Sequence, residues 1–220
     1  VAGVCLLRTG RYGTAGVAMA YAALNRVFPA IFFWGWLIEA VLDTLRERRV
    51  VVVREGSVSA DDGALAPPAR IRSVAIAGDE AGAALAAMLV MFLRGRGLAV
   101  SDLGSERLTP LDYVDAAAAV ASPVARGEVD AGIVVDATGI GSAIAANKLA
   151  GIRAATASSE MLARLSRERS GANVLTLGAV VVGTDEAKAI VTMWLGTPMQ
   201  DPAEIRRLGK IRDLERASRE

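Results

Sequence analysis

The chain of 220 residues contains no histidine and a single cysteine, Cys5. Histidine is the commonest metal ligand and the usual acid–base group near neutral pH, so its absence excludes histidine-based triads and histidine-ligated zinc. One cysteine excludes an intrachain disulfide framework and is typical of a reducing compartment. We therefore expect a cytoplasmic protein without a histidine-ligated metal.

The chain also lacks an excess of either charge, and it contains few aromatic residues. The net charge is +1, which gives no general attraction to nucleic acid or to an anionic membrane. Aromatic residues make up only 5% of the chain, whereas hydrophobic residues of all kinds make up 53%. This composition is typical of a globular chain rather than a disordered one.

Seven aromatic residues are concentrated between Tyr12 and Trp36. Arg26 interrupts the apolar run there, and Pro29 would kink a helix, so the pattern favours an amphipathic or partner-packing helix over a membrane span. A segment translated from a mis-assigned start is the third interpretation. A short apolar run at 50–53 is compatible with a strand.

The composition changes again around residue 70. Residues 54–70 are rich in Gly, Ser and Asp and contain paired prolines, which is typical of a linker. We therefore predict an N-terminal apolar and aromatic extension with its linker over residues 1–69. Residues 70–220 are predicted to form a separate α/β domain.

Strand-like and helix-like segments alternate regularly from Ile71 onward. Five apolar runs predict strands at 73–78, 98–104, 130–137, 152–157 and 173–179. Helical patterns follow at 81–97, 110–127, 158–171, 185–196 and 201–220, and a short helix after the glycine loop ends at Lys148. We expect the helix at 110–127 to break near Pro123. This order predicts right-handed βαβ units, and hence a Rossmann-like three-layer α/β/α fold with a five-stranded parallel sheet.

The segment "DATGIGSAIAANK" (136–148) joins the third predicted strand to a helix. Gly139 and Gly141 let the backbone turn with its N–H groups pointing one way, and a helix N-terminus follows. Together these favour an anion or a developing oxyanion. By itself the pattern is equally consistent with a tight turn that binds nothing, because it matches neither the Walker nor the dinucleotide-binding spacing. Loop 137–142 lies at the carboxyl end of a strand, where α/β sheets bind their ligands.

Several strings, taken in their order along the chain, resemble the ribose-5-phosphate isomerase type B / galactose-6-phosphate isomerase family. They are "TGIGSAIAANK" (138–148), "GIRAA" (151–155), "ANVLTLGA" (172–179) and "RRLGKI" (206–211). The resemblance covers about residues 72–212. It implies a Rossmann-like fold and reversible, metal-free aldose–ketose isomerisation of a sugar phosphate through an enediolate cradled by the glycine loop.

The resemblance also implies an assembly and a set of site residues. The expected assembly is a homodimer or homotetramer with the site between subunits, and a hetero-oligomer with a paralogue stays open because one branch pairs unlike subunits. Catalytic positions fall on Asp136 and Thr138. Substrate-binding positions fall on Asp79, Glu80, Tyr113, Gly139, Gly141, Asn147, Asn173 and Arg207.

Several positions depart from the family pattern. The proton-shuttling Cys of the family falls on Asp136, and the Glu that replaces it in a variant branch falls on Ser142. Histidines of the family fall on Glu80 and on or beside Ser170, and its C-terminal Arg-His pair falls on Ala203 and Glu204. Each lost charge-assisted contact is worth about 1.5–3 kcal/mol, so the changes should weaken phosphate capture.

Two interpretations of Asp136 follow. A carboxylate is a legitimate base for moving a proton between adjacent carbons. The same carboxylate beside the loop amides would compete with the enediolate, which favours a structural or vestigial role.

Three functional hypotheses therefore stand. The first is an isomerase with altered substrate or reduced activity. The second is a catalytically degenerate partner subunit. The third and weakest is a hard-cation site made by Asp79, Glu80 and Asp136.

Overall fold

The computed structural model describes residues 60–104 and 111–218. The aromatic segment between Tyr12 and Trp36 and the strand expected at 50–53 lie outside these residues. The chain divides into two compact units, Val1–Val52 and Val53–Glu220, and all described residues belong to the second. Within this described part, no helix combines the length and the apolar character needed to cross a membrane.

A five-stranded parallel sheet forms the centre of the second unit, which confirms the predicted fold class. The strand order is β2-β1-β3-β5-β4, so the winding direction reverses between β1 and β3. The strands are β1 (Ser73–Gly78), β2 (Ala99–Asp102), β3 (Ala131–Asp136), β4 (Ala154–Thr156) and β5 (Val174–Gly178). The five apolar runs of the sequence each supply one of them.

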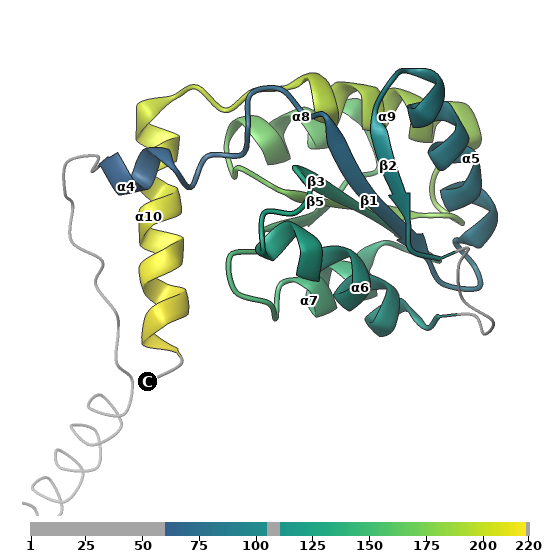
Figure 1. The fold of residues 1–220 in the computed structure, drawn as a ribbon, viewed down its shortest axis with the longest axis horizontal. Coiled ribbons are helices and arrows are strands. Elements are labelled where there is room, and N and C mark those ends of the chain that lie inside the picture. Colours follow the sequence, from purple (N-terminus) through teal and green to yellow (C-terminus); the bar gives the residue numbers. More distant parts are fainter. Residues whose placement is uncertain (1–59, 105–110, 219–220) are drawn as a thin grey trace, which may run out of the picture. The chain divides into compact units, whose positions relative to one another are not determined.

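Helices cover both faces of the sheet (Figure 1). One face carries α5 (Ala83–Gly95), α8 (Glu160–Glu168) and α9 (Thr184–Gly196). The other carries α6 (Tyr113–Ala125) and α7 (Ile140–Ala146). A short helix, α4 (Ala60–Gly63), precedes the sheet, and α10 (Pro202–Ala217) follows it.

Alternate residues of each inner strand enter two different cores. In β1, Val74 and Ile76 pack on the side of α5 and α9, whereas Ala75 and Ala77 face α6. The alanines leave room for α6 to lie close to the sheet. Gly132 of β3 serves the same purpose, because a Cβ there would come within 2.5 Å of a methyl group of Val120.

Helix α6 continues through Pro123 to Ala125, so the expected break near Pro123 is wrong. The proline lies in the last turn, where its missing N–H removes a single intrahelical hydrogen bond and little helix follows that a kink could disrupt. The hydroxyl of Ser122 also donates to the carbonyl of Ala118, at 2.7 Å.

Asp130 joins the amino ends of β1 and β3. Its carboxylate Oδ2 accepts hydrogen bonds from the backbone N–H groups of Arg72 (2.7 Å) and Ser73 (2.9 Å). Its own N–H donates to the hydroxyl of Ser73, at 3.0 Å. Burial alone would raise the pKa of Asp130, but these hydrogen bonds outweigh it and hold the pKa below its usual value.

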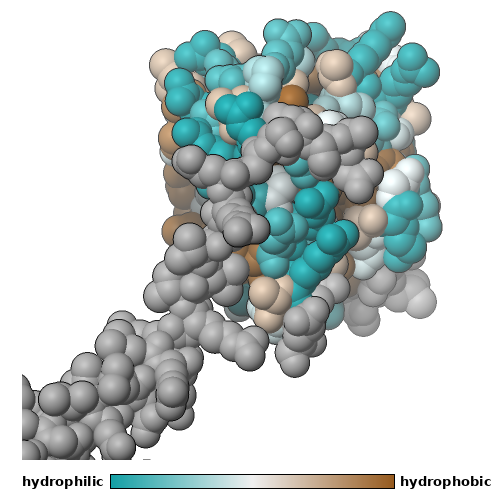
Figure 2. Space-filling view, turned by 90° about the vertical axis from the view of Figure 1, so that its left-hand side faces the viewer, coloured by the Kyte–Doolittle hydropathy of each residue, from teal (hydrophilic) through white to brown (hydrophobic). Residues whose placement is uncertain are grey.

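Helix α10 is attached to the unit by polar contacts and by the buried side chain of Leu208. The Arg212 guanidinium lies 3.2 Å from the Asp62 carboxylate of α4, and the Glu215 carboxylate accepts from the N–H of Gly151 at 3.0 Å. A pocket of about 510 Å³ lies between α10 and the β4 edge, lined by Leu208 and Ile211 among others. Figure 2, seen from the side of α10, shows a mostly hydrophilic described surface.

Two arginines, the fully buried Arg167 and the half-buried Arg153, bind the segment that precedes β1. Arg153 donates to the carbonyl of Leu65 at 2.9 Å, and Arg167 donates to the carbonyl of Pro68 at 3.3 Å. The side chain of Arg167 is fully buried, and its guanidinium lies 5.0 Å from the ring centroid of Trp194. Burial, with a further contribution from the charge of Arg153, lowers the pKa of Arg167 to about 10.

Candidate functional site

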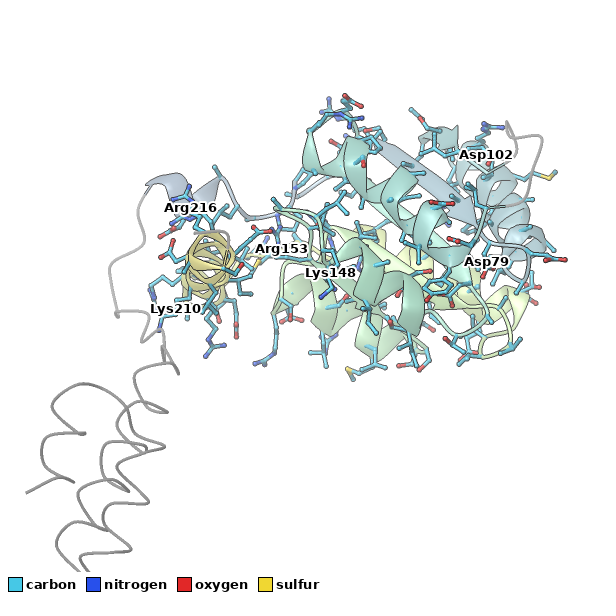
Figure 3. All side chains as sticks on the ribbon, turned by 90° about the horizontal axis from the view of Figure 1, so that it is seen from below. Asp79, Asp102, Lys148, Arg153, Lys210 and Arg216 are labelled. Atoms are coloured by element: carbon cyan, nitrogen blue, oxygen red, sulfur yellow. The ribbon has the colours of Figure 1, made fainter. Side chains whose placement is uncertain are left out.

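The glycine loop follows the carboxyl end of β3. This strand lies beside β1, where the winding order of the parallel sheet reverses. Gly78 at the end of β1 pairs with Val135, and the N–H of Asp79 donates to the carbonyl of Val135 at 3.1 Å. Asp79 and Asp136 therefore lie at the same edge of the sheet, as expected for residues at the carboxyl ends of two strands of a parallel sheet. Figure 3 shows Asp79 and Asp102, the last residue of β2, at the same end of the unit.

Both loop glycines are required by close packing. Gly139 has a φ of +80° and stands at the N-cap of α7. A Cβ on Gly139 would lie 2.8 Å from the methyl carbon of Thr156, and one on Gly141 would lie 2.9 Å from the ring of Tyr113. The structure thus brings Tyr113, Gly139 and Gly141 together, with the tyrosine ring half-exposed over the loop.

The carboxylate of Asp136 occupies the N–H groups of the loop. Its Oδ1 accepts from the N–H of Thr138 at 2.6 Å and from the N–H of Gly139. Its Oδ2 accepts from the N–H of Ser142 at 2.9 Å and from the Ser142 hydroxyl at 2.5 Å. Only 4% of Asp136 is exposed. The sequence predicts that the loop N–H groups bind an anion from outside the protein. In the structure these N–H groups already bind the Asp136 carboxylate.

This environment keeps Asp136 ionised. Burial by itself would raise the pKa of Asp136, but hydrogen bonds from the Ser142 hydroxyl and from the amides of Gly139, Ser142 and Thr138 outweigh it and lower the pKa. Each carboxylate oxygen already accepts two hydrogen bonds. A low pKa and filled acceptor positions both disfavour proton abstraction, so the geometry favours the structural interpretation of Asp136 over the base.

Other predicted site residues at this edge also have local partners. The Asp79 carboxylate accepts from the N–H of Gly82 at 2.8 Å, which closes the turn after β1. The hydroxyl of Thr138 accepts from the N–H of Ile140 at 3.3 Å. The side chain of Glu80 is exposed.

The two predicted asparagines bind backbone rather than lining the loop. Asn147 accepts from the N–H of Ala154 at 2.8 Å and donates to its carbonyl at 2.9 Å, which attaches the end of α7 to β4. Asn173 accepts from the N–H of Arg153 at 2.8 Å and donates to the carbonyl of Gly151 at 2.9 Å. Both contacts explain these residues structurally, and their contact with substrate stays a prediction.

Arg207 is not brought to the loop of its own chain. It lies on α10, exposed, with its guanidinium 2.5 Å from the carboxylate of Glu204. Figures 1 and 3 place α10, with Lys210 and Arg216, on the side of the unit away from Asp79. A role for Arg207 in a site shared between subunits stays a prediction.

The carboxylates at this edge do not converge on a common point. No group of three potential metal ligands is present among residues 60–104 and 111–218. Asp79 and Asp136 each face backbone amides instead. The hypothesis of a hard-cation site therefore receives no support from the described residues.

Sequence reasoning missed the hydroxyl groups that support the loop. The role of Ser142 became visible only from its bonds to Asp136. The hydroxyl of Thr156 donates to the carbonyl of Gly139 at 2.9 Å, and the hydroxyls of Thr156 and Thr176 lie 2.9 Å apart. Thr176 is the one polar residue in the buried run "VLTLG", and that exception was the available signal.

Comparisons with known proteins identify the family of the chain. Residues 74–211 match the family model described as Ribose/Galactose Isomerase. The chain is 41% identical over 145 residues to ribose-5-phosphate isomerase B of Escherichia coli (strain K12), covering 66% of this chain and 97% of that protein. It is 36% identical over 119 residues to galactose-6-phosphate isomerase subunit LacA of Streptococcus mutans, covering 54% of this chain and 82% of that protein.

A solved structure extends the comparison to the fold. The chain superposes on ribose-5-phosphate isomerase B of Clostridium thermocellum with a TM-score of 0.64 and 42% identity. The match covers 66% of this chain and 99% of that one. The family resemblance predicted for about residues 72–212 is confirmed.

Proposed function

Because the chain belongs to the ribose/galactose isomerase family, we propose that it is a sugar-phosphate isomerase of reduced activity. The observation that carries this proposal is the position of the Asp136 carboxylate on the amides of the glycine loop. The loop keeps the shape that suits an enediolate, and Asp136 limits how often an enediolate can form there.

Two physical effects reduce turnover. An enediolate at the loop would have to displace the Asp136 carboxylate or lie beside it, and two adjacent negative charges destabilise each other. In addition, an ionised carboxylate whose pKa is lowered by four hydrogen bonds is a weak proton acceptor. Both effects act on the chemical step more than on the binding of the distant phosphate.

The proposed substrate is a phosphorylated aldose or ketose of five or six carbons. Its reacting end would lie against the glycine loop, beneath the ring of Tyr113. Figure 3 shows Lys148 and Arg153 away from this end of the unit, toward α10. The phosphate would therefore be met by cations of a second subunit, with Arg207 on the exposed side of α10 as the candidate.

The test is the isomerisation of ribose 5-phosphate and galactose 6-phosphate by the full chain and two Asp136 variants. We expect slow turnover in the wild type and no loss of turnover in Asp136→Asn, which removes one of the two repelling charges. Asp136→Cys should turn over about 10²-fold faster, because it frees the amides and supplies a thiol of suitable pKa. Asp130→Asn, which alters a similar amide-binding carboxylate at the other end of β3, is the control and should leave the rate unchanged.

The opposite result is equally clear. A loss of about 10²–10⁴ in rate in Asp136→Asn, with folding retained, would show that Asp136 is the base after all. That outcome would overturn the proposed role of Asp136 while leaving the family assignment intact.

Similarity to a subunit of galactose-6-phosphate isomerase favours one second candidate, a partner subunit without turnover of its own. This function requires stable association with an unlike, catalytically complete paralogue. Co-purification of such a paralogue, together with no turnover in the wild type and in Asp136→Cys, would favour it over the first.

A further inference from the structure

Two threonine hydroxyls lie directly beneath the glycine loop. Thr156 of β4 and Thr176 of β5 are register partners in the sheet, and their hydroxyl oxygens are 2.9 Å apart. The hydroxyl of Thr156 also lies 2.9 Å from the carbonyl oxygen of Gly139. Thr176 is fully buried, in a strand whose other residues are apolar or glycine.

The direction of these hydrogen bonds follows from the number of protons. A carbonyl oxygen can only accept, so the single hydroxyl proton of Thr156 is donated to Gly139. The Thr156 oxygen must then be the acceptor toward Thr176, which donates its own proton. The result is a one-way relay from Thr176 to Thr156 to the carbonyl of Gly139.

Gly139 is thereby held on both sides. Its carbonyl is drawn toward β4 by Thr156, and its N–H points to the carboxylate of Asp136. The φ of Gly139 is +80°. Glycine adopts positive and negative φ about equally, so the backbone preference of Gly139 does not by itself fix this orientation. The methyl group of Thr156 also fills the space next to the Gly139 α-carbon.

We propose that Thr156 and Thr176 are positioning residues that aim the Gly139 N–H at the anion held in the glycine loop. In the present structure that anion is the Asp136 carboxylate, and during turnover it would be the substrate. The role goes beyond the proposed isomerase function, because it holds whether or not the loop turns over a sugar phosphate.

A purely structural role for the pair makes a different prediction. Two threonines that only satisfy each other inside the sheet would contribute to folding stability without affecting the charge state of Asp136. A relay that aims an amide at the carboxylate affects both. The pKa of Asp136 therefore separates the two roles.

The experiment is an NMR titration of the Asp136 carboxyl carbon in the full chain and in matched variants. Thr156→Val keeps the shape of the side chain but removes the hydroxyl, and it should raise the pKa of Asp136 by up to about one unit. Thr156→Ser keeps the hydroxyl and should restore a value close to the wild type. Thr176→Val should give a smaller rise, and no further rise when added to Thr156→Val, because Thr176 acts only through Thr156.

Thr197→Val is the control, because the Thr197 hydroxyl makes a similar bond to the carbonyl of Met193, far from the loop. It should lower stability and leave the Asp136 pKa unchanged. Equal pKa values in wild type and Thr156→Val would overturn the proposal, as would additive shifts in the double variant. If Thr156→Val does not fold, the shift in Thr176→Val alone decides the matter. None of these readouts requires turnover, so failure of the isomerase proposal would be distinguishable.

Discussion

The two ends of β3 are built with the same parts and differ in what surrounds them. At the amino end, Gly127 has a φ of +69° and Asp130 binds two backbone amides. At the carboxyl end, Gly139 has a φ of +80° and Asp136 binds three. A Cβ on Gly127 would meet open space, whereas one on Gly139 would meet Thr156 and Leu177.

The comparison shows that a carboxylate that caps backbone amides can lie in a region suited to ligand binding. A carboxylate that caps exposed amides is an ordinary way to fix a strand end, and Asp130 does nothing more. The same device at the carboxyl end fills the region where parallel sheets bind ligands. Under the proposal made above, Asp136 is a strand-end cap located in the candidate site.

The largest expected difference between the two ends concerns the glycines. Gly139→Ala combines the cost of a left-handed backbone with overlap against the Thr156 methyl, and should lower the free energy of unfolding by about 3–4 kcal/mol. Gly127→Ala carries the backbone cost alone, about 1–2 kcal/mol. Urea unfolding of both variants measures the difference, and equal losses would contradict the crowding argument.

An intermediate effect is expected for the carboxylates. Asp136→Asn places an amide donor against the loop's own N–H groups and should lower the free energy of unfolding by about 2 kcal/mol at pH 7. Asp130 is half-buried and accepts fewer hydrogen bonds than Asp136. Asp130→Asn should therefore lower the free energy of unfolding by about 1 kcal/mol. Chemical unfolding under identical conditions compares them, and a larger loss for Asp130→Asn would show that the loop tolerates a neutral side chain.

The smallest effect is the pH dependence of these losses. Both carboxyls have a lowered pKa in the folded state, so their contribution is fully present above the unfolded pKa of about 3.9. It disappears as the pH falls through the folded pKa. The penalty of Asp136→Asn should thus be larger at pH 7 than at pH 3, as unfolding curves at the two pH values would show. A penalty that does not change with pH would mean that the charge of Asp136 is not what the loop stabilises.

Sequence patterns predicted the fold because they reflect burial. Apolar runs such as 130–137 identify inner strands, and the glycine spacing identifies a tight turn at the end of one of them. The shared edge of Asp79 and Asp136 followed from strand alternation alone. These features depend on residue type and spacing, which the sequence displays directly.

The contents of the site depended on backbone directions that residue types do not display. Whether Asp136 faces outward or turns onto the loop amides is decided by a few torsion angles, among them the positive φ of Gly139. The Thr156–Thr176 pair joins residues 20 positions apart and requires the strand register. Arg207, which the family resemblance assigns to a site between subunits, lies on a helix that reaches a different side of the unit.

Arg153 and Arg167 show which residues a shortened chain would need to keep. Family similarity begins at residue 74, yet the carbonyls that receive the guanidinium protons of Arg153 and Arg167 include those of Leu65 and Pro68. A chain trimmed to the matched segment would leave the buried Arg167 and the half-buried Arg153 each short of one acceptor. The packed α/β unit therefore includes residues that precede the segment matched by the family model, among them Leu65 and Pro68.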